Sequence, residues 1–84
     1  METNILPLIM APPGEKLRVV SLSGGRGLQN HLISMGLGPG SEIEVVKSGA
    51  PGPFLIRIKD TRLALGYGIA RKVMVSVNSR PKNY

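Results

Sequence analysis

The sequence predicts a mainly β protein, a small barrel of five to six short strands with one short α-helix inserted among them. Apolar residues make up 42% of the chain and aromatic residues only 4%, so the core must consist of Val, Ile and Leu, which favour strands. The alternating apolar segments are short and separated by Gly and Pro, and closure into a barrel removes the exposed edges of such strands. The 84 residues suffice for one domain, 1–84, with a folded core at about 13–77 and a frayed tail at 78–84.

The first strand is expected within residues 12–22, after a turn at Pro13-Gly14. Its inward side chains are Leu17, Val19 and Leu22, while Val20 directly after Val19 interrupts strict alternation. Such an interruption predicts a β-bulge or burial on both faces of the strand. The segment "SGGRG" then ends the strand, because glycines favour turn conformations that other residues avoid.

One short helix is expected next. Leu28, Leu32 and Met35 recur at helical spacing and form one narrow apolar stripe. Gly36 follows at the position where a left-handed residue commonly ends a helix, and Leu37 can fold back on the stripe. The sequence therefore predicts an abrupt, fixed end to this helix.

The segment that leaves the helix allows two interpretations. Pro39 prevents the helix from resuming, so Leu37, Gly38 and Pro39 could stand out as a rigid lip that loses little entropy when a partner docks. Alternatively, the segment only closes a small core.

The remaining strands follow the same alternation. Strands are expected at 41–47, at 54–59 and, after a tight turn at Asp60-Thr61, at 62–66. A single helical turn then precedes the last strand, 73–77. The residues expected to face the core are Ile43, Val45, Phe54, Ile56, Ile58, Val73, Val75 and Val77.

Positive charge is concentrated in the C-terminal third. The net charge is +6, yet up to residue 56 four bases balance four acids. Beyond that point seven bases accompany Asp60 alone. This asymmetry indicates an acidic protein surface, a nucleic acid or an anionic membrane face as partner, or else merely the solvated outer faces of strands.

Catalytic residues are scarce. The chain has no cysteine, which excludes disulfides, thiolate metal sites and cysteine catalysis and permits a reducing cytoplasm, where we expect the protein to reside. His31 is the single histidine, and no segment resembles a nucleophile elbow. We therefore expect no enzymatic activity, with His31 as a partly exposed structural residue.

Metal and cofactor sites are not predicted either. Glu42 and Glu44 share one face of a strand and could hold a hard cation loosely, but solvated side chains are the simpler interpretation. The glycine-rich segment before the helix lacks the Lys-Ser/Thr of a phosphate loop. Arg26, beside the expected helix N-terminus, could still attract a carboxylate or phosphate of a partner, or the segment could be a simple turn.

No direct membrane insertion is expected. No apolar run approaches the roughly 18 residues that span a bilayer, and the apolar "NILPLIMAPP" is short and contains Pro7. Any connection to a membrane is therefore expected to run through a partner. Weak self-association, through strand edges or the "ILPLIM" segment, stays open.

A basic small-barrel nucleic-acid-binding protein is the alternative function. Such barrels combine a basic face with stacking aromatic side chains, and here the aromatic residues are Phe54, Tyr67 and Tyr84. Phe54 is expected inward and Tyr84 is the last residue, which leaves Tyr67. One ring is a poor stacking platform, so we expect no specific nucleic acid.

The motifs in order resemble the FeoA family of ferrous iron transport. "HLISMGLGPGSEIEVV" is followed by "PGPFLIRI" and "RLALGYGIARKVMV", matching a helix that ends in Leu-x-x-Met-Gly-Leu, then x-Pro-Gly and an alternating strand. The positions that match are Leu32, Met35, Gly36, Leu37, Pro39, Gly40, Gly52, Pro53, Ala64, Leu65, Ala70, Val73 and Val75.

This resemblance implies an SH3-like barrel with an inserted helix. It also implies an accessory role beside FeoB, a membrane transporter whose cytoplasmic part hydrolyses GTP, through protein contact and without a cofactor. We expect a partner to contact the segment that leaves the helix, basic side chains and one tyrosine. The candidate contact residues are Arg26, Leu37, Gly38, Pro39, Tyr67, Arg71 and Lys72.

Overall fold

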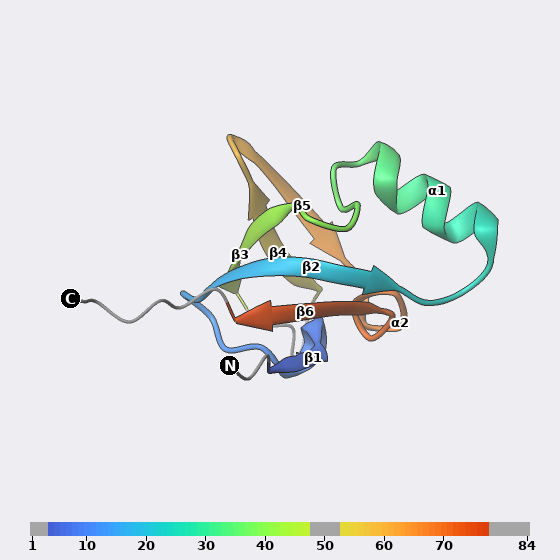
Figure 1. The fold of residues 1–84 in the computed structure, drawn as a ribbon. Helices are drawn as coiled ribbons and strands as arrows, with labels where there is room; N and C mark the ends of the chain where they lie inside the picture. The colour runs from blue at the N-terminus through green and yellow to red at the C-terminus, as the bar shows by residue number, and fades with distance from the viewer. Residues whose placement is uncertain (1–3, 48–52, 78–84) are drawn as a thin grey trace.

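The computed structural model describes residues 4–47 and 53–77 and places six antiparallel strands in one sheet of order β1-β6-β2-β3-β4-β5. The sheet bends around a common core, and its helices lie at one side (Figure 1). The strands are β1 (Ile5–Pro7), β2 (Lys16–Leu22), β3 (Glu42–Lys47), β4 (Phe54–Ile58), β5 (Thr61–Leu65) and β6 (Val73–Val77). The helical segments are the 3-10 turn η1 (Leu8–Met10), the helix α1 (Arg26–Ser34) and the single turn α2 (Tyr67–Ala70). The predicted mainly β fold with one inserted helix is confirmed. Among the described residues β1 and β5 remain the two edges of the sheet, so the strands curve around the core without pairing into a fully closed ring.

The core is one cluster of aliphatic side chains from every element, with Phe54 as its single ring. The inward positions predicted for β2, β3, β4 and β6 are buried, apart from Leu22 and Val77, which are half-buried and pack against the cluster. The buried members are Leu8, Ala11, Leu17, Val19, Leu32, Leu37, Ile43, Val45, Phe54, Ile56, Ile58, Leu65, Ala70, Val73 and Val75.

The irregularity predicted in β2 is a β-bulge. The register against β6 shifts between Val19, which lies opposite Val75, and Ser21, which lies opposite Met74. The extra residue reverses the alternation, so Leu22 packs against the core while Ser21 is exposed. The two adjacent valines therefore lie where the inward-facing positions of β2 shift by one residue.

The folded part begins earlier than residue 13, where the core was expected to start. In β1, Leu6 lies opposite Val75 of β6, and Leu8 in η1 is fully buried. Pro7 is accommodated because β1 is the edge strand of the sheet. The 3-10 turn buries Leu8 and exposes Met10, which differs from a strand, where residues two apart share a face. The predicted tail, 78–84, lies outside the described residues.

The β4–β5 turn lies one residue earlier than predicted. Ile58 lies opposite Thr61, so the turn residues are Lys59 and Asp60 instead of Asp60 and Thr61. Lys59 has a φ of 55°, a left-handed conformation that turns use and strands do not. Alternation alone could not detect this, because an exposed Lys59 fits either the end of a strand or the start of a turn.

Candidate functional site

The predicted fixed end of α1 is a Schellman motif. Gly36 has a φ of 97° and its N–H donates to the Ile33 carbonyl at 2.9 Å, while the Leu37 N–H donates to the Leu32 carbonyl, also at 2.9 Å. These two bonds satisfy carbonyls that the helix end would otherwise leave unpaired. We call the segment that follows, residues 36–41, the exit loop.

Leu37 is not a contact residue, which corrects its place among the candidates. Its side chain and that of Leu32 are both 0% exposed, forming the apolar contact that accompanies a Schellman motif. Gly38 is half-buried and Pro39 is exposed. Each interpretation of this segment therefore applies to a different residue. Leu37 closes the core, and Pro39 remains available to a partner.

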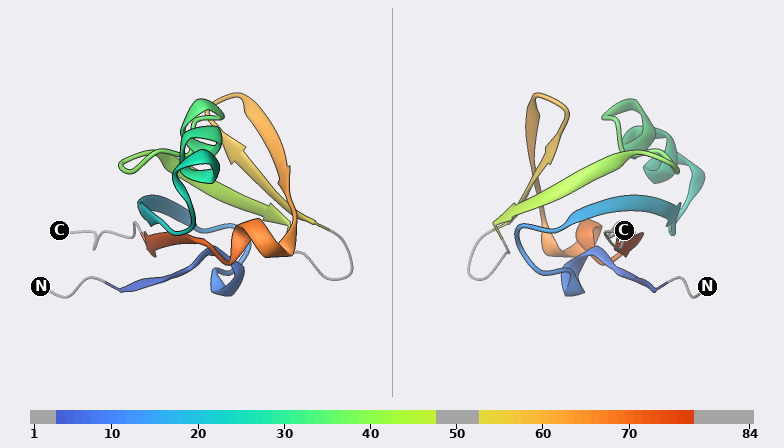
Figure 2. Two further views of the ribbon diagram at one scale, coloured as in Figure 1. Left: turned by 90° about the vertical axis from the view of Figure 1, so that its right-hand side faces the viewer. Right: turned by 60° about the vertical axis from the view of Figure 1, so that its left-hand side comes forward.

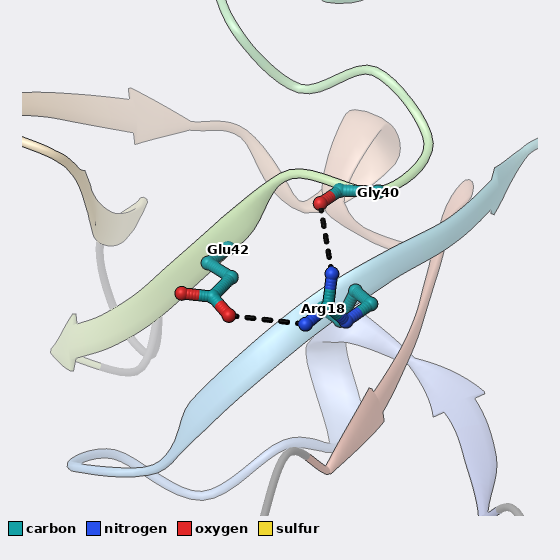
Figure 3. Close-up of polar contacts among 3 residues, drawn as sticks. All are labelled: Arg18, Gly40 and Glu42. Atoms are coloured by element: carbon teal, nitrogen blue, oxygen red, sulfur yellow. Dashed lines mark hydrogen bonds and ion pairs between the residues drawn. The ribbon is translucent and has the colours of Figure 1, made fainter.

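The exit loop is also attached to β2. The Gly40 N–H donates to the Val19 carbonyl at 2.8 Å, and the Val19 N–H donates to the Ser41 carbonyl at 2.9 Å. Arg18 adds two side-chain hydrogen bonds, from Nη1 to the Gly40 carbonyl at 3.3 Å and from Nη2 to Oε2 of Glu42 at 3.1 Å (Figure 3). The start of the loop is thus held by the last turn of α1, and its end by residues of β2 that are far away in sequence.

A hollow lies between the exit loop and the β4–β5 turn. Next to it, Ile33 of α1 is 48% exposed, and a Cβ added to Gly38 would lie 3.5 Å from Ile33 Cγ1. We call the surface formed by Ile33, Gly38, Pro39 and Lys59 the exit-loop surface. The hollow itself is lined by Gly36, Pro39, Gly40, Ser41, Glu42, Ile58 and Lys59.

The outer face of β2, β3 and β4 carries alternating charges. Glu44 lies opposite Lys16 on one side and Arg57 on the other, and Arg57 Nη2 bonds its Oε1 at 3.2 Å. Together with the Arg18–Glu42 pair, this engages both carboxylates that could have held a cation. In residues 4–47 and 53–77, no three His, Cys, Asp or Glu side chains are placed to hold a metal ion.

The remaining basic candidates meet at the other end of α1. The Ser23 N–H donates to the Lys72 carbonyl at 2.8 Å, and the Lys72 side chain passes beside Gly24, whose added Cβ would lie 3.6 Å from Lys72 Cδ. Arg26, the first residue of α1, is exposed nearby. Folding therefore brings Lys72 beside the residues that lead into α1, although the two segments are distant in sequence.

Tyr67 and Arg71 belong to the same helical turn. The Arg71 N–H donates to the Tyr67 carbonyl at 3.1 Å, and this spacing places both side chains on one face of α2. The turn contacts η1, which carries the exposed Met10. Figure 2, left, shows α2 with η1 below it and the N-terminal end of α1 above it, all toward the viewer. We call Met10, Arg26, Tyr67, Arg71 and Lys72 the basic end face.

The candidate residues thus form two groups. Gly38 and Pro39 lie at the C-terminal end of α1, and Arg26, Tyr67, Arg71 and Lys72 lie at its N-terminal end. Sequence reasoning missed Met10, Ile33 and Lys59, whose exposure depends on the 3-10 turn, the narrow apolar stripe and the turn position. His31 is exposed on α1 and belongs to neither group.

The family model for the FeoA domain matches residues 6–77, which is most of the chain. The chain belongs to the FeoA family. The match begins at residue 6, which lies within β1.

Individual FeoA relatives extend the likeness. A protein of Methanocaldococcus jannaschii named as an Fe(2+) transport protein A is 38% identical over 69 residues, covering 82% of this chain and 83% of its own. A crystal structure of an iron uptake regulatory protein (FeoA) is 41% identical, with a TM-score of 0.80, and covers 87% of this chain and 97% of its own. The Stenotrophomonas maltophilia FeoA, solved with zinc and described as an SH3 domain protein, is 26% identical with a TM-score of 0.69, covering 89% of each chain.

These findings place the chain in ferrous iron transport and give it an SH3-like fold. Within the part of the chain that the structure describes, no helix has the length and apolar character needed to cross a membrane.

Proposed function

We propose that this FeoA protein is a cytoplasmic, non-catalytic accessory module that regulates a FeoB-like membrane transporter by binding its cytoplasmic GTPase part. Family membership supports the link to ferrous iron transport. The binding surface in this proposal is the exit-loop surface.

The observation that carries the proposal is the exit loop, which is held in place but remains exposed. Two backbone bonds tie its start to α1 and two more tie its end to β2. Pro39 and Gly40 nevertheless remain exposed. A loop already held in one conformation loses little entropy on binding, so more of the contact energy contributes to affinity.

The surroundings of the loop suit a protein partner. The hollow beside it combines the apolar Ile58 with the charged Glu42 and Lys59, and the exposed Ile33 extends the apolar part. Apolar side chains beside polar and charged ones are a combination that protein interfaces share.

The test is a calorimetric titration of the isolated GTPase domain of a cognate transporter, in nucleotide-free, GDP-bound and GTP-analogue-bound states. The wild-type protein should bind in at least one state. Gly38→Gln should weaken that binding by about tenfold or more, because the added side chain stands on the exit-loop surface. Its Cβ is tolerated, since its nearest neighbour would be Ile33 at 3.5 Å.

Gly27→Gln is the matched control, because it places the same side chain at the other end of α1, where an added Cβ meets nothing within 4 Å. It should leave the affinity unchanged. Absence of binding in all three nucleotide states would contradict the proposal, as would equal weakening by the two variants.

The nucleic-acid alternative makes a different prediction. Phe54 is buried, so Tyr67 is the exposed aromatic side chain among the described residues, and acids interrupt the basic outer face of the sheet. We expect oligonucleotide binding to disappear near physiological salt. Binding that persists there and depends on Tyr67 would favour the alternative.

A further inference from the structure

We infer that the basic end face binds the surface of an anionic lipid membrane. This goes beyond the proposed contact with the transporter, which uses the other end of α1, and it does not depend on that contact. The sequence led us to expect a membrane connection only through a partner. The structure adds a peripheral contact that requires no spanning segment.

The apolar part of the face consists of two protruding side chains. Met10 is 65% exposed and Tyr67 is 63% exposed, and the two short elements that carry them, η1 and α2, contact each other. Tyrosine suits the boundary of a membrane, because its ring is apolar and its hydroxyl is polar. Methionine is flexible and adapts to an irregular apolar surface.

Three cations accompany these side chains. Arg71 shares a face of α2 with Tyr67, Lys72 follows it, and the Ser23–Lys72 bond brings the start of α1 and Arg26 alongside. Basic side chains next to exposed apolar ones are the combination by which peripheral proteins bind anionic lipids.

The acids of the described ranges lie elsewhere. Glu15 precedes β2, at the end of the β2–β6 pair where Leu17 lies opposite Val77. The basic end face adjoins the opposite end of this strand pair, where Leu22 lies opposite Val73. Glu42 and Glu44 are on β3, and Asp60 is at the end of β5 remote from α2. No described carboxylate therefore offsets the attraction of this face to an anionic surface.

The exposure of Met10 and Tyr67 on two short helical turns favours a membrane over a protein. Strong side-chain contacts between proteins are usually made in well-packed, desolvated pockets, and the hollow described above lies instead at the exit loop. Met10 and Tyr67 are exposed on the single turns η1 and α2, and a fluid layer of lipid headgroups can adapt to their positions. A folded acidic partner would need a matching cavity for each.

The two surfaces can be occupied at once. They lie at opposite ends of the nine-residue helix α1, which at 1.5 Å per residue is about 14 Å long. A protein held on the membrane by its end face would still present its exit-loop surface.

The experiment is vesicle co-sedimentation of the full chain at about 0.15 M salt, with phosphatidylcholine vesicles that contain or lack phosphatidylglycerol. The protein should sediment with the anionic vesicles only. The double variant Arg26→Glu/Arg71→Glu should lower the partition coefficient by roughly 30-fold or more. Tyr67→Ser should lower it by roughly three- to tenfold with no change in charge.

The matched control is Lys47→Glu/Arg62→Glu, which changes the net charge equally at exposed positions on β3 and β5. It should leave most of the binding intact. Absence of sedimentation with anionic vesicles would overturn the inference, and so would equal losses in the two double variants, which would indicate a response to net charge alone.

A second measurement separates a lipid from a protein on this face. If Arg26→Glu/Arg71→Glu keeps its vesicle binding but no longer binds the isolated GTPase domain, the face is a protein interface and the inference is wrong. Loss of vesicle binding with retained domain binding would support it. If the proposed contact with the transporter is wrong, the calorimetric titration of the GTPase domain will show no binding, while vesicle co-sedimentation will be unaffected.

Discussion

The two ends of α1 differ in how they are built. At the C-terminal end, backbone hydrogen bonds to α1 and β2 and the buried Leu37 fix the exit loop. At the N-terminal end, the Ser23–Lys72 backbone bond and a bond from Gln29 Nε2 to the Gly24 carbonyl hold the residues before the helix, and the neighbouring surface carries exposed Met10, Arg26, Tyr67 and Arg71. The two ends therefore differ mainly in what they expose: a fixed backbone loop at the first and apolar and basic side chains at the second. Substitutions should affect folding at the first end and mainly binding at the second.

The largest expected effect on stability is that of Leu37→Ala. Leu37 is fully buried beside Leu32, and truncating a buried leucine costs about 2–5 kcal/mol. Urea denaturation should show this loss in the free energy of unfolding. Met10→Ala, on the basic end face, should change it by less than about 0.5 kcal/mol. Similar small effects of both substitutions would mean that Leu37 is exposed after all.

Gly36→Val should cost about 2 kcal/mol, because a β-branched residue is strained at a φ of 97°. The nearest atom to an added Cβ is Ile58 Cγ2 at 3.5 Å, an ordinary contact, so the Cβ itself adds no clash to the backbone cost. Gly27→Ala, inside α1 at the other end, should instead stabilise by about 0.5–1 kcal/mol. The midpoint temperatures of thermal unfolding should shift in opposite directions in the two variants. An unchanged midpoint temperature in Gly36→Val would contradict the left-handed conformation at the end of the helix.

Arg18→Ala should cost about 0.5–1 kcal/mol. Its ion pair with Glu42 has side chains that are 48% and 62% exposed, and exposed pairs contribute little. A double-mutant cycle with Glu42→Ala isolates this pair. Its coupling energy should shrink as salt is raised, and a salt-independent coupling would contradict an exposed pair.

Arg26→Glu/Arg71→Glu should have the smallest effect on stability, within about 0.5 kcal/mol. Both side chains are exposed, and a glutamate in the first turn of α1 interacts favourably with the helix dipole. Denaturation midpoints close to wild type would confirm that any loss of vesicle binding is a surface effect. A loss above about 2 kcal/mol would show that this end is also conformationally constrained.

Local patterns predicted much of the fold. Strand alternation identified Ile43, Val45, Phe54 and Ile56 as inward because the two faces of a strand are distinguishable within a few residues. The left-handed Gly36 was also predictable, since glycine after an apolar helical stripe is a local signal.

The rest depended on contacts between distant segments. No sequence pattern indicates that Arg18 bonds the Gly40 carbonyl or that Lys72 lies beside Gly24, because both follow from tertiary register. Leu37 illustrates the limit within the site: the sequence allowed it either to pack on the helix or to stand out towards a partner, and only the structure decided for burial. The grouping of the candidate residues into two surfaces likewise required the structure.

The calorimetric titration of the transporter's GTPase domain tests the central claim most directly, that the exit-loop surface is where the partner docks. We predict that wild-type protein and the Arg26→Glu/Arg71→Glu variant bind the domain with equal affinity, while Gly38→Gln binds about tenfold or more weakly. Full affinity in Gly38→Gln, together with lost affinity in the Arg26→Glu/Arg71→Glu variant, would contradict the account.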